Sequence, residues 1–279
     1  MTPATRPNDK ERVREHYDRM SPYYRALWGE HIHHGYWIHG DESKETAQIQ
    51  LIEHLAEAAG IQSGAKILDV GCGFGASSIF LAQKYEAQAT GITISQVQVE
   101  MASKAAAEAG VKAKFLFMDA EAMTFEQPFD VVWSVESISH YQDIPNFLMA
   151  AANLLNPGGT LAITDWFKKK GVTPRECKKY LHNIEHGMLV KLHSMEDYAG
   201  YIEASGLVVT HTEVLNKYCA KTWDFGLDII KDKALWGVAA QNGRDFVRFL
   251  RAFKDIRAGY ASGNFIYGLM VAKKIEAKA

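Results

Sequence analysis

KILDVGCGFGASS, residues 66–78, joins a short apolar run to a glycine-rich turn. A short, bounded apolar run such as KILDV is expected of a buried strand in a parallel sheet. Gly71, Gly73 and Gly75 follow it at every second position. Because glycine has no Cβ, such a turn lets the backbone approach a ligand closely. The stretch therefore predicts a ligand-binding turn at the carboxyl end of a first strand.

Strand and helix patterns alternate around this turn for about a hundred residues. Strands are predicted at 66–70, 88–94, 114–119, 129–135 and 160–166, and helices at 76–85, 96–109 and 145–155, with a turn at Asn156–Gly159. Such alternation predicts right-handed βαβ units and a doubly wound parallel sheet.

The rhythm differs on both sides of this core. Helical patterns are predicted at 9–28 and 43–59 before it, and after residue 166 a helical region at 174–204, a strand at 207–215, a mostly helical stretch at 218–259 and a strand at 264–274. We expect an α/β fold: a Rossmann-like, doubly wound, mostly parallel seven-stranded sheet with an antiparallel last strand and a helical lid. The chain, 1–279, is expected to be a single domain with an N-terminal helical lid at 1–60, a cofactor-binding core at 61–166, and a substrate cap with the last two strands at 167–279.

Composition narrows the possible partners and compartments. The formal net charge is -2 and the longest basic run is Lys168–Lys170, which argues against a nucleic-acid partner. The first twenty residues lack the apolar stretch of a secretory signal, and no window suggests stable membrane insertion. Cys72, Cys177 and Cys219 lie far apart, as expected of reduced thiols in a cytoplasmic protein.

The glycine turn leaves two cofactor classes open, dinucleotides and S-adenosylmethionine. The NAD fingerprint is GxGxxG followed some twenty residues later by an acid for the ribose. This sequence has GxGxG, and its second strand ends in Gly-Ile-Thr-Ile-Ser without an acid. The pattern departs from that of NAD enzymes, although a turn with a purely structural role remains an alternative.

Several motifs in combination decide between them. DVGCGFGASS, GITISQVQ, MDAEAM, FDVVWSVESISHYQD and NPGGTLAITDW together resemble the class I S-adenosylmethionine-dependent methyltransferases. LWGEHIHHGYW at 27–37 and the closing GYASGNFIYGLMVAKK are similar to γ-tocopherol methyltransferases. There is similarity also to rebeccamycin-type sugar O-methyltransferases and sarcosine/dimethylglycine N-methyltransferases. The resemblance implies S-adenosyl-L-methionine as the cofactor.

The resemblance also implies that strand ends and the N-terminal segment hold this cofactor. The residues so implied are Asp69, Gly71 and Gly73 for the methionine moiety, Thr93 and Gln98 for the ribose, Asp119 and Ala120 for the adenine, Ser134 beside the sulfonium, and Tyr24, Trp28 and His33 as a cover.

Catalysis is expected just past the fourth strand. His140 lies where the family places a catalytic or substrate-orienting residue, and an imidazole can take a proton near neutral pH. Asp165 ends the fifth strand at the same sheet edge and could pair with His140. Glu136 lies on the same loop or caps the following helix. The alternative for His140 is a helix-start residue in a surface loop.

The histidines and aromatics admit structural explanations as well. In HIHHGYW no Cys or carboxylate is arranged with the histidines, so no metal is expected. The aromatic residues of 223–253 fit either helix packing or the lining of an apolar substrate pocket. These residues are Trp223, Phe225, Trp236, Phe246, Phe249 and Phe253.

The expected activity is methyl transfer to a carbon, oxygen or nitrogen nucleophile of a small to mid-sized, partly apolar metabolite. An isoprenoid quinol, a terpenoid or an indole-type natural product fits the tocopherol resemblance. N-methylation of a small amine such as sarcosine is the alternative within the class. An NAD-dependent oxidoreductase, or a methyltransferase-like binding protein without activity, lies outside it. We expect a small-molecule partner and leave a homodimer open.

Overall fold

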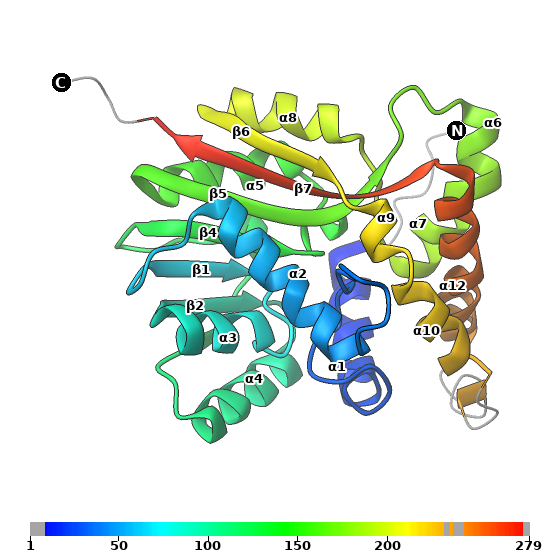
Figure 1. Ribbon diagram of the computed structural model, residues 1–279, viewed down its shortest axis with the longest axis horizontal. Coiled ribbons are helices and arrows are strands. Elements are labelled where there is room, and N and C mark those ends of the chain that lie inside the picture. Colours follow the sequence, from blue (N-terminus) through cyan, green and yellow to red (C-terminus); the bar gives the residue numbers. More distant parts are fainter. Residues whose placement is uncertain (1–8, 232–234, 237–242, 276–279) are drawn as a thin grey trace.

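Strands of one mixed sheet organise the part of the chain that the structure describes. The computed structural model describes residues 9–231, 235–236 and 243–275. Its seven strands run in the order β3-β2-β1-β4-β5-β7-β6 (Figure 1). They are β1 (Lys66–Val70), β2 (Gln88–Thr93), β3 (Lys114–Phe117), β4 (Phe129–Val135), β5 (Leu155–Lys168), β6 (Leu207–Val214) and β7 (Phe265–Lys274).

The pairing of these strands confirms the expected fold class. Strand β1 pairs in parallel with β2 on one side and with β4 on the other. Strand β7 runs antiparallel between β5 and β6. Because the strand order reverses between β1 and β4, a crevice is expected at their carboxyl ends.

Helices cover the sheet and extend beyond one end of it. The main helices described are α1 (Asp9–Trp28), α2 (Lys44–Ala59), α3 (Ala76–Tyr85), α4 (Gln96–Ala109), α5 (Ile144–Leu154), α6 (Pro174–Glu176), α7 (His182–Met188), α8 (Met195–Ala204), α9 (Asn216–Cys219), α10 (Thr222–Ile229) and α12 (Arg244–Ser262). Figure 1 shows α1, α7, α10 and α12 gathered beyond the end toward which the arrow of β1 points.

Local signals explain several helix boundaries. The Ser43 side chain accepts a hydrogen bond from the Thr46 amide at the start of α2, and Gly60 ends that helix in the left-handed region. Ser95 caps α4 in the same way by accepting from the amide of Gln98. These polar and glycine residues flank the apolar helical patterns, so the sequence predicts these boundaries closely.

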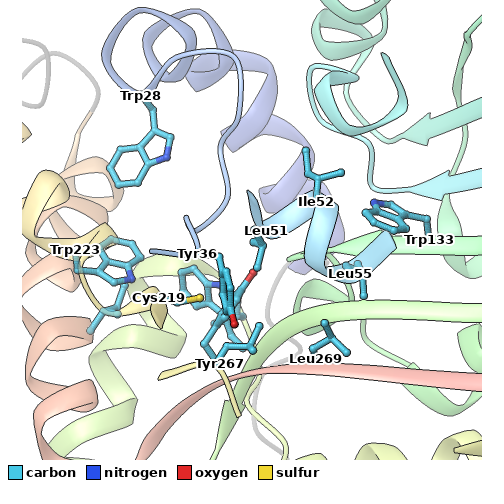
Figure 2. Close-up of a cluster of buried hydrophobic side chains, with 14 of the residues drawn as sticks. Trp28, Tyr36, Leu51, Ile52, Leu55, Trp133, Cys219, Trp223, Tyr267 and Leu269 are labelled. Atoms are coloured by element: carbon cyan, nitrogen blue, oxygen red, sulfur yellow. The ribbon is translucent and has the colours of Figure 1, made fainter. Parts of the chain in front are cut away.

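Alternate residues of the central strands enter two different cores. On one face Ile67, Trp133 and Leu269 pack with α2, whereas their neighbours Leu68 and Val132 pack on the other face with α5 and α8. The first core continues without interruption from α2 to the helices beyond the end of the sheet, such as α1 and α10. Figure 2 shows it running from Leu51, Ile52 and Leu55 to Trp28 and Trp223. The helices beyond the end of the sheet therefore pack into the same hydrophobic core as one face of the sheet.

The predicted N-terminal lid needs a correction. Only α1 and residues 29–37 border the crevice described below, whereas α2 buries Leu51, Ile52 and Leu55 in the core on the sheet face. Those three residues lie on one side of a helix because they are spaced by one, three and four positions. Helix α2 therefore belongs to the core, where it packs against one face of the sheet.

Two other expectations are also wrong in detail. The expected helical region 174–204 is broken: Leu189 has a φ of +57° after α7, and the chain is not helical again until Ser194 caps α8. The expected turn at Asn156–Gly159 is part of β5, which begins at Leu155 and shifts its register against β4. Residues 232–234 and 237–242 of the expected helical stretch 218–259 lie outside the described residues.

Gly71 is required by both its backbone and its surroundings. Its φ is +75°, and a Cβ there would lie 1.9 Å from the Oγ atom of Ser137. We predict that Gly71→Ala lowers the free energy of unfolding by roughly 2–5 kcal/mol, because left-handed strain and overpacking add. Urea denaturation measures this change.

Gly110→Ala is the matched control. Gly110 has a similar φ of +68°, but a Cβ there meets nothing within 4 Å. Its substitution should therefore cost only the backbone strain, about 1–2 kcal/mol. Equal losses in the two variants would contradict the steric role assigned to Ser137.

Candidate active site

One cavity opens at the carboxyl ends of the central strands. Its walls come from the ends of β1, β2 and β4, from α1 with residues 29–37, and from α7, α10 and α12. The strand order places the crevice there, and the helices beyond the sheet in Figure 1 close over it. Segments far apart in the sequence therefore meet around one space.

The glycine turn forms the floor of this cavity. The amides of Gly71 and Cys72 both donate to the carbonyl of Ile92, which ties the turn to β2. Within the described residues, the amides of Gly73 and Phe74 have no protein acceptor, and Gly75 precedes α3 without a side-chain cap. The turn thus offers free N–H donors to a carboxylate or another anionic group.

Gly75 has a different role from its two neighbours. A Cβ on Gly75 would lie 2.5 Å from the ring of Phe115 and 2.9 Å from Ala102. It is therefore needed for packing between the turn, α4 and β3. The sequence suggested that Gly75 lets the backbone approach a ligand closely, but packing alone explains why a glycine is needed at this position.

Asp69 lies beneath the turn at the end of β1. Its side chain is buried and accepts a hydrogen bond of 2.6 Å from Ser78. Burial raises the pKa of Asp69 to about 6, although the bonds from Ser78 oppose that rise. The carboxylate lines the cavity beside the free amides and is placed to meet a cationic group.

Thr93 and Gln98 form a polar pair at the end of β2. Thr93 Oγ1 donates to Gln98 Oε1 at 2.6 Å. This fixes the orientation of the amide, and no acceptor among the described residues is bonded to the Gln98 NH₂ group. A ribose hydroxyl is a suitable acceptor for such a donor. Next to this pair, Ser95 Oγ donates to Asp18 of α1 at 2.6 Å.

Asp119 and Ala120 lie at the opening of the cavity past β3. Asp119 Oδ2 accepts from Lys10 Nζ at 2.6 Å, and Lys10 also pairs with Glu121 at 2.9 Å. Burial alone would lower the pKa of Lys10, but the two carboxylates outweigh it and raise that pKa. The amide of Ala120 has no acceptor in the described part of the chain. The sequence gave no indication of Lys10.

Ser134 does not line the cavity. It is fully buried within the sheet, and its Oγ donates to the carbonyl of Val70 at 3.3 Å. Its side chain is occupied between β4 and β1. The position beside the sulfonium that the resemblance implied needs this correction.

His140 lies at the cavity wall in a defined tautomer. Its Nδ1–H donates to the carbonyl of Leu189 at 2.9 Å, so Nε2 carries the lone pair. The hydroxyl of Tyr17 donates to Nε2 at 3.1 Å. Burial lowers the pKa of His140, which keeps the imidazole neutral near pH 7. The structure thus presents a neutral base toward the cavity, and His140 is not a surface-loop residue.

Asp165 is not hydrogen-bonded to His140. One of its oxygens accepts from the amide of Ser139 at 3.0 Å and the other from the amide of Trp166 at 2.7 Å. It is fully buried and does not line the cavity. The expected direct pairing is wrong in this structure. Asp165 holds the loop that carries His140 through the amide of Ser139.

Glu136 is a central residue of the site. It follows β4 with a φ of +52°, and its carboxylate accepts from the His34 amide, His34 Nδ1, the Trp166 indole and the Tyr267 hydroxyl. Burial raises the pKa of Glu136, but the interactions with His34 and His33 outweigh it and lower that pKa to about 2. Its partners come from residues 29–37, β5 and β7, so sequence spacing could not reveal it.

The histidines of residues 31–34 form a chain of hydrogen bonds. His31 Nδ1 lies 3.2 Å from His33 Nε2, and His33 Nδ1 donates to the carbonyl of His34 at 2.7 Å. Burial lowers the pKa of both His31 and His33, that of His31 to about 3. Among the residues described, no group of three His, Cys, Asp or Glu side chains is arranged to hold a metal ion.

Aromatic side chains form one part of the cavity wall. The residues of this aromatic wall are Tyr24, Trp28, Trp166, Trp223, Phe249 and Phe253. Trp28 and Trp223 lie 6.0 Å apart between ring centroids, and Trp223 and Phe253 lie 5.0 Å apart. The aromatic pattern of α10 and α12 thus lines a pocket as well as packing the lid. Phe225 instead stacks on Trp37.

Comparison with known proteins agrees with this geometry. The family model described as "Mycolic acid cyclopropane synthetase" matches residues 4–264. The chain belongs to this family. The 27-O-demethylrifamycin SV methyltransferase of Amycolatopsis mediterranei is 31% identical over 90% of this chain and 94% of that protein. A probable chloroplastic tocopherol O-methyltransferase of Oryza sativa subsp. japonica is 30% identical over 97% of this chain and 80% of that protein.

A solved structure shares the fold of this family member. The mycolic acid cyclopropane synthase CmaA1, solved with S-adenosylhomocysteine, superposes with a TM-score of 0.85 over 96% of this chain and 99% of that chain. The identity is 22%, so this likeness shows the fold alone. Together, the family and the named relatives make the chain an S-adenosylmethionine-dependent methyltransferase. The oxidoreductase and binding-protein alternatives fall away.

The residues of this methyltransferase fit its cofactor. Free amides at Gly73 and Phe74 suit the carboxylate of the methionine moiety, and Asp69 suits its ammonium group. The free amide of Ala120 suits a ring nitrogen of adenine. Asp119 also lines this end of the cavity, with Lys10 paired to it.

Asp165 gives the stability of this methyltransferase a pH dependence. Burial raises its pKa from the ordinary 3.8 to about 7, although the two amide donors oppose that rise. From about pH 4 to about pH 7 the folded state keeps a proton that the unfolded state has lost, so stability falls as pH rises. We predict that Asp165→Asn removes this part of the fall.

Urea denaturation of both proteins at the two ends of this window measures the effect. The variant should be less stable throughout, because an amide cannot accept from both backbone donors. Its stability should nevertheless change less with pH. Asp69, whose pKa is also raised, is present in both proteins and cancels in the comparison. Equal pH dependence in both proteins would contradict the raised pKa.

Proposed function

We propose that this methyltransferase acts on a carbon, oxygen or nitrogen nucleophile of a small to mid-sized, partly apolar metabolite. The observation that carries the proposal is the continuity of one cavity from the glycine turn, past His140, to the aromatic wall. A polar end suits the cofactor, and an apolar aromatic end suits an acceptor such as an isoprenoid quinol, a terpenoid or an indole-type natural product.

The chemistry divides between the cofactor and the chain. When bound, S-adenosylmethionine supplies an activated methyl group on a positively charged sulfur. The chain's task is to align the nucleophile and to exclude water. Helix α1 closes the cavity through Lys10, Tyr17 and Asp18, each hydrogen-bonded to a residue at the cofactor or catalytic end.

His140 is the proposed base. Its Nε2 lone pair faces Tyr17, and an acceptor hydroxyl or amine that displaces this contact can give its proton to Nε2. The Nδ1–H bond to Leu189 holds the ring during this exchange. Asp165 is proposed as a positioning residue through Ser139.

The relatives support a mid-sized acceptor more than a small zwitterion. Their names give a rifamycin and tocopherol as acceptors. A zwitterion such as sarcosine needs a cation for its carboxylate. Among the described residues that line the cavity, Lys10 is the sole lysine or arginine, and it is paired with Asp119 and Glu121. The aromatic wall itself offers no such cation.

The test is an assay with an isotope-labelled methyl donor. A panel of prenylated quinols, terpenoids, indoles and small amines is offered, and label transfer is measured for each. Label on an apolar acceptor supports the proposal, and transfer confined to sarcosine and related amino acids contradicts it. Calorimetric titration with S-adenosylmethionine and NADH checks the cofactor separately.

His140→Ala tests the base. We predict that turnover falls by about 10²-fold or more, the usual contribution of a general base. The affinity for S-adenosylhomocysteine should remain within a few fold, because no cofactor contact is assigned to this side chain. In the wild type, the acid limb of the rate profile should lie below the ordinary histidine pKa, since burial lowers the pKa of His140.

His193→Ala is the control for this variant. His193 is a half-buried histidine that does not line the cavity. It should keep wild-type turnover. Unchanged turnover in His140→Ala would remove His140 from the mechanism.

The remaining expectations also stay proposals. We propose the three-part organisation with α2 reassigned to the core.

None of the described helices is long and apolar enough to cross a bilayer. The three free cysteines support a reducing compartment such as the cytoplasm, although the tocopherol relatives are chloroplastic. A homodimer stays a prediction for sedimentation analysis.

A further inference from the structure

The charge of Glu136 is held by neutral groups. Its Oε1 accepts from the His34 amide at 2.6 Å, His34 Nδ1 at 2.9 Å and the Tyr267 hydroxyl at 2.8 Å. Its Oε2 accepts from the Trp166 indole at 2.8 Å. Each of these donors can stabilise a carboxylate without cancelling its charge.

His34 is itself neutral in this arrangement. An indole N–H can only donate, and Trp223 Nε1 donates to His34 Nε2 at 2.7 Å. That nitrogen therefore carries no proton, while Nδ1–H donates to Glu136. No lysine or arginine of the described residues is paired with Glu136. The carboxylate is thus held in a buried site by hydrogen bonds, without a lysine or arginine partner in the described part of the chain.

The two oxygens of Glu136 are unequally hydrogen-bonded. Three hydrogen bonds reach Oε1, whereas Oε2 receives a single one, from Trp166. The side chain is 10% exposed and lines the cavity beside Trp166 and Trp223. A carboxylate attracts cations by its charge, and neighbouring aromatic faces attract them by cation–π interaction.

We propose that Glu136 selects acceptors whose reacting atom is neutral before methyl transfer and positively charged after it, of which an uncharged amine on an apolar molecule is the clearest case. This rests on the proposed function and deepens it. The lone pair of the amine forms the new N–C bond, and the electrons of the S–C bond return to sulfur. The positive charge moves from sulfur to nitrogen, and His140 or water then takes the ammonium proton.

The same charge disfavours acceptors that react as anions. A phenolate or carboxylate brought beside Glu136 would place two negative charges in a site of low dielectric constant. Neutral alcohols and electron-rich carbons, which develop positive charge on methylation, remain compatible. Glu136 therefore restricts the range of acceptors by their charge, whereas the aromatic wall restricts it by their shape and polarity.

A pair of isosteric probes tests this. The cation is 3-(trimethylammonio)phenol and the neutral partner is 3-tert-butylphenol, which differ in charge at one atom. Dissociation constants for both are measured by calorimetry on the complex with S-adenosylhomocysteine, in the wild type and in Glu136→Gln. Glu213→Gln, a change outside the cavity, is the control.

We expect Glu136→Gln to weaken the cation by 10-fold or more relative to the neutral probe, and Glu213→Gln to leave the ratio unchanged. The double variant Glu136→Gln/Trp166→Phe removes the indole donor that a glutamine NH₂ would oppose, and it should show the same loss if the single variant folds poorly. A ratio that stays the same in every variant, or a wild type that binds the neutral probe alone, overturns the proposal. Failure to bind S-adenosylhomocysteine would instead count against the proposed function.

Discussion

The hydrogen-bonded carboxylate of Glu136 is the interaction on which the site depends. Burying a charge is costly unless it is hydrogen-bonded, and here the donors come from His34, Trp166 and Tyr267. Trp223 of α10 joins the network through His34. Residues 29–37, the sheet and the lid therefore meet at one carboxylate. Its left-handed backbone, which is unfavourable for a non-glycine residue, is held by these contacts.

Helix α1 completes the cavity by a second set of polar contacts. Lys10, Tyr17 and Asp18 lie on one side of the helix, since they are seven and eight positions apart. They contact Asp119, His140 and Ser95, which lie after three different strands. One helix therefore contacts the loops that follow β2, β3 and β4 along one side of the cavity.

Much of the fold follows from local patterns. The five core strands were predicted to within a few residues, except that β5 begins five residues earlier, because buried parallel strands leave strong apolar runs. Breaks such as Leu189, which takes a left-handed conformation without being glycine, left no such signal. Ser134 was misplaced because strand position predicts an edge of the sheet, but not which way a side chain turns.

The sequence by itself determined the alternation of strands and helices, the glycine turn after β1 and the family, since each depends on neighbouring residues or short motifs. Tertiary structure alone decided that Asp165 holds Ser139 and not His140, that Lys10 reaches Asp119, and that Glu136 joins segments more than 100 residues apart. The physical reason is that buried polar groups need partners, and only the folded chain decides which ones lie within hydrogen-bonding distance.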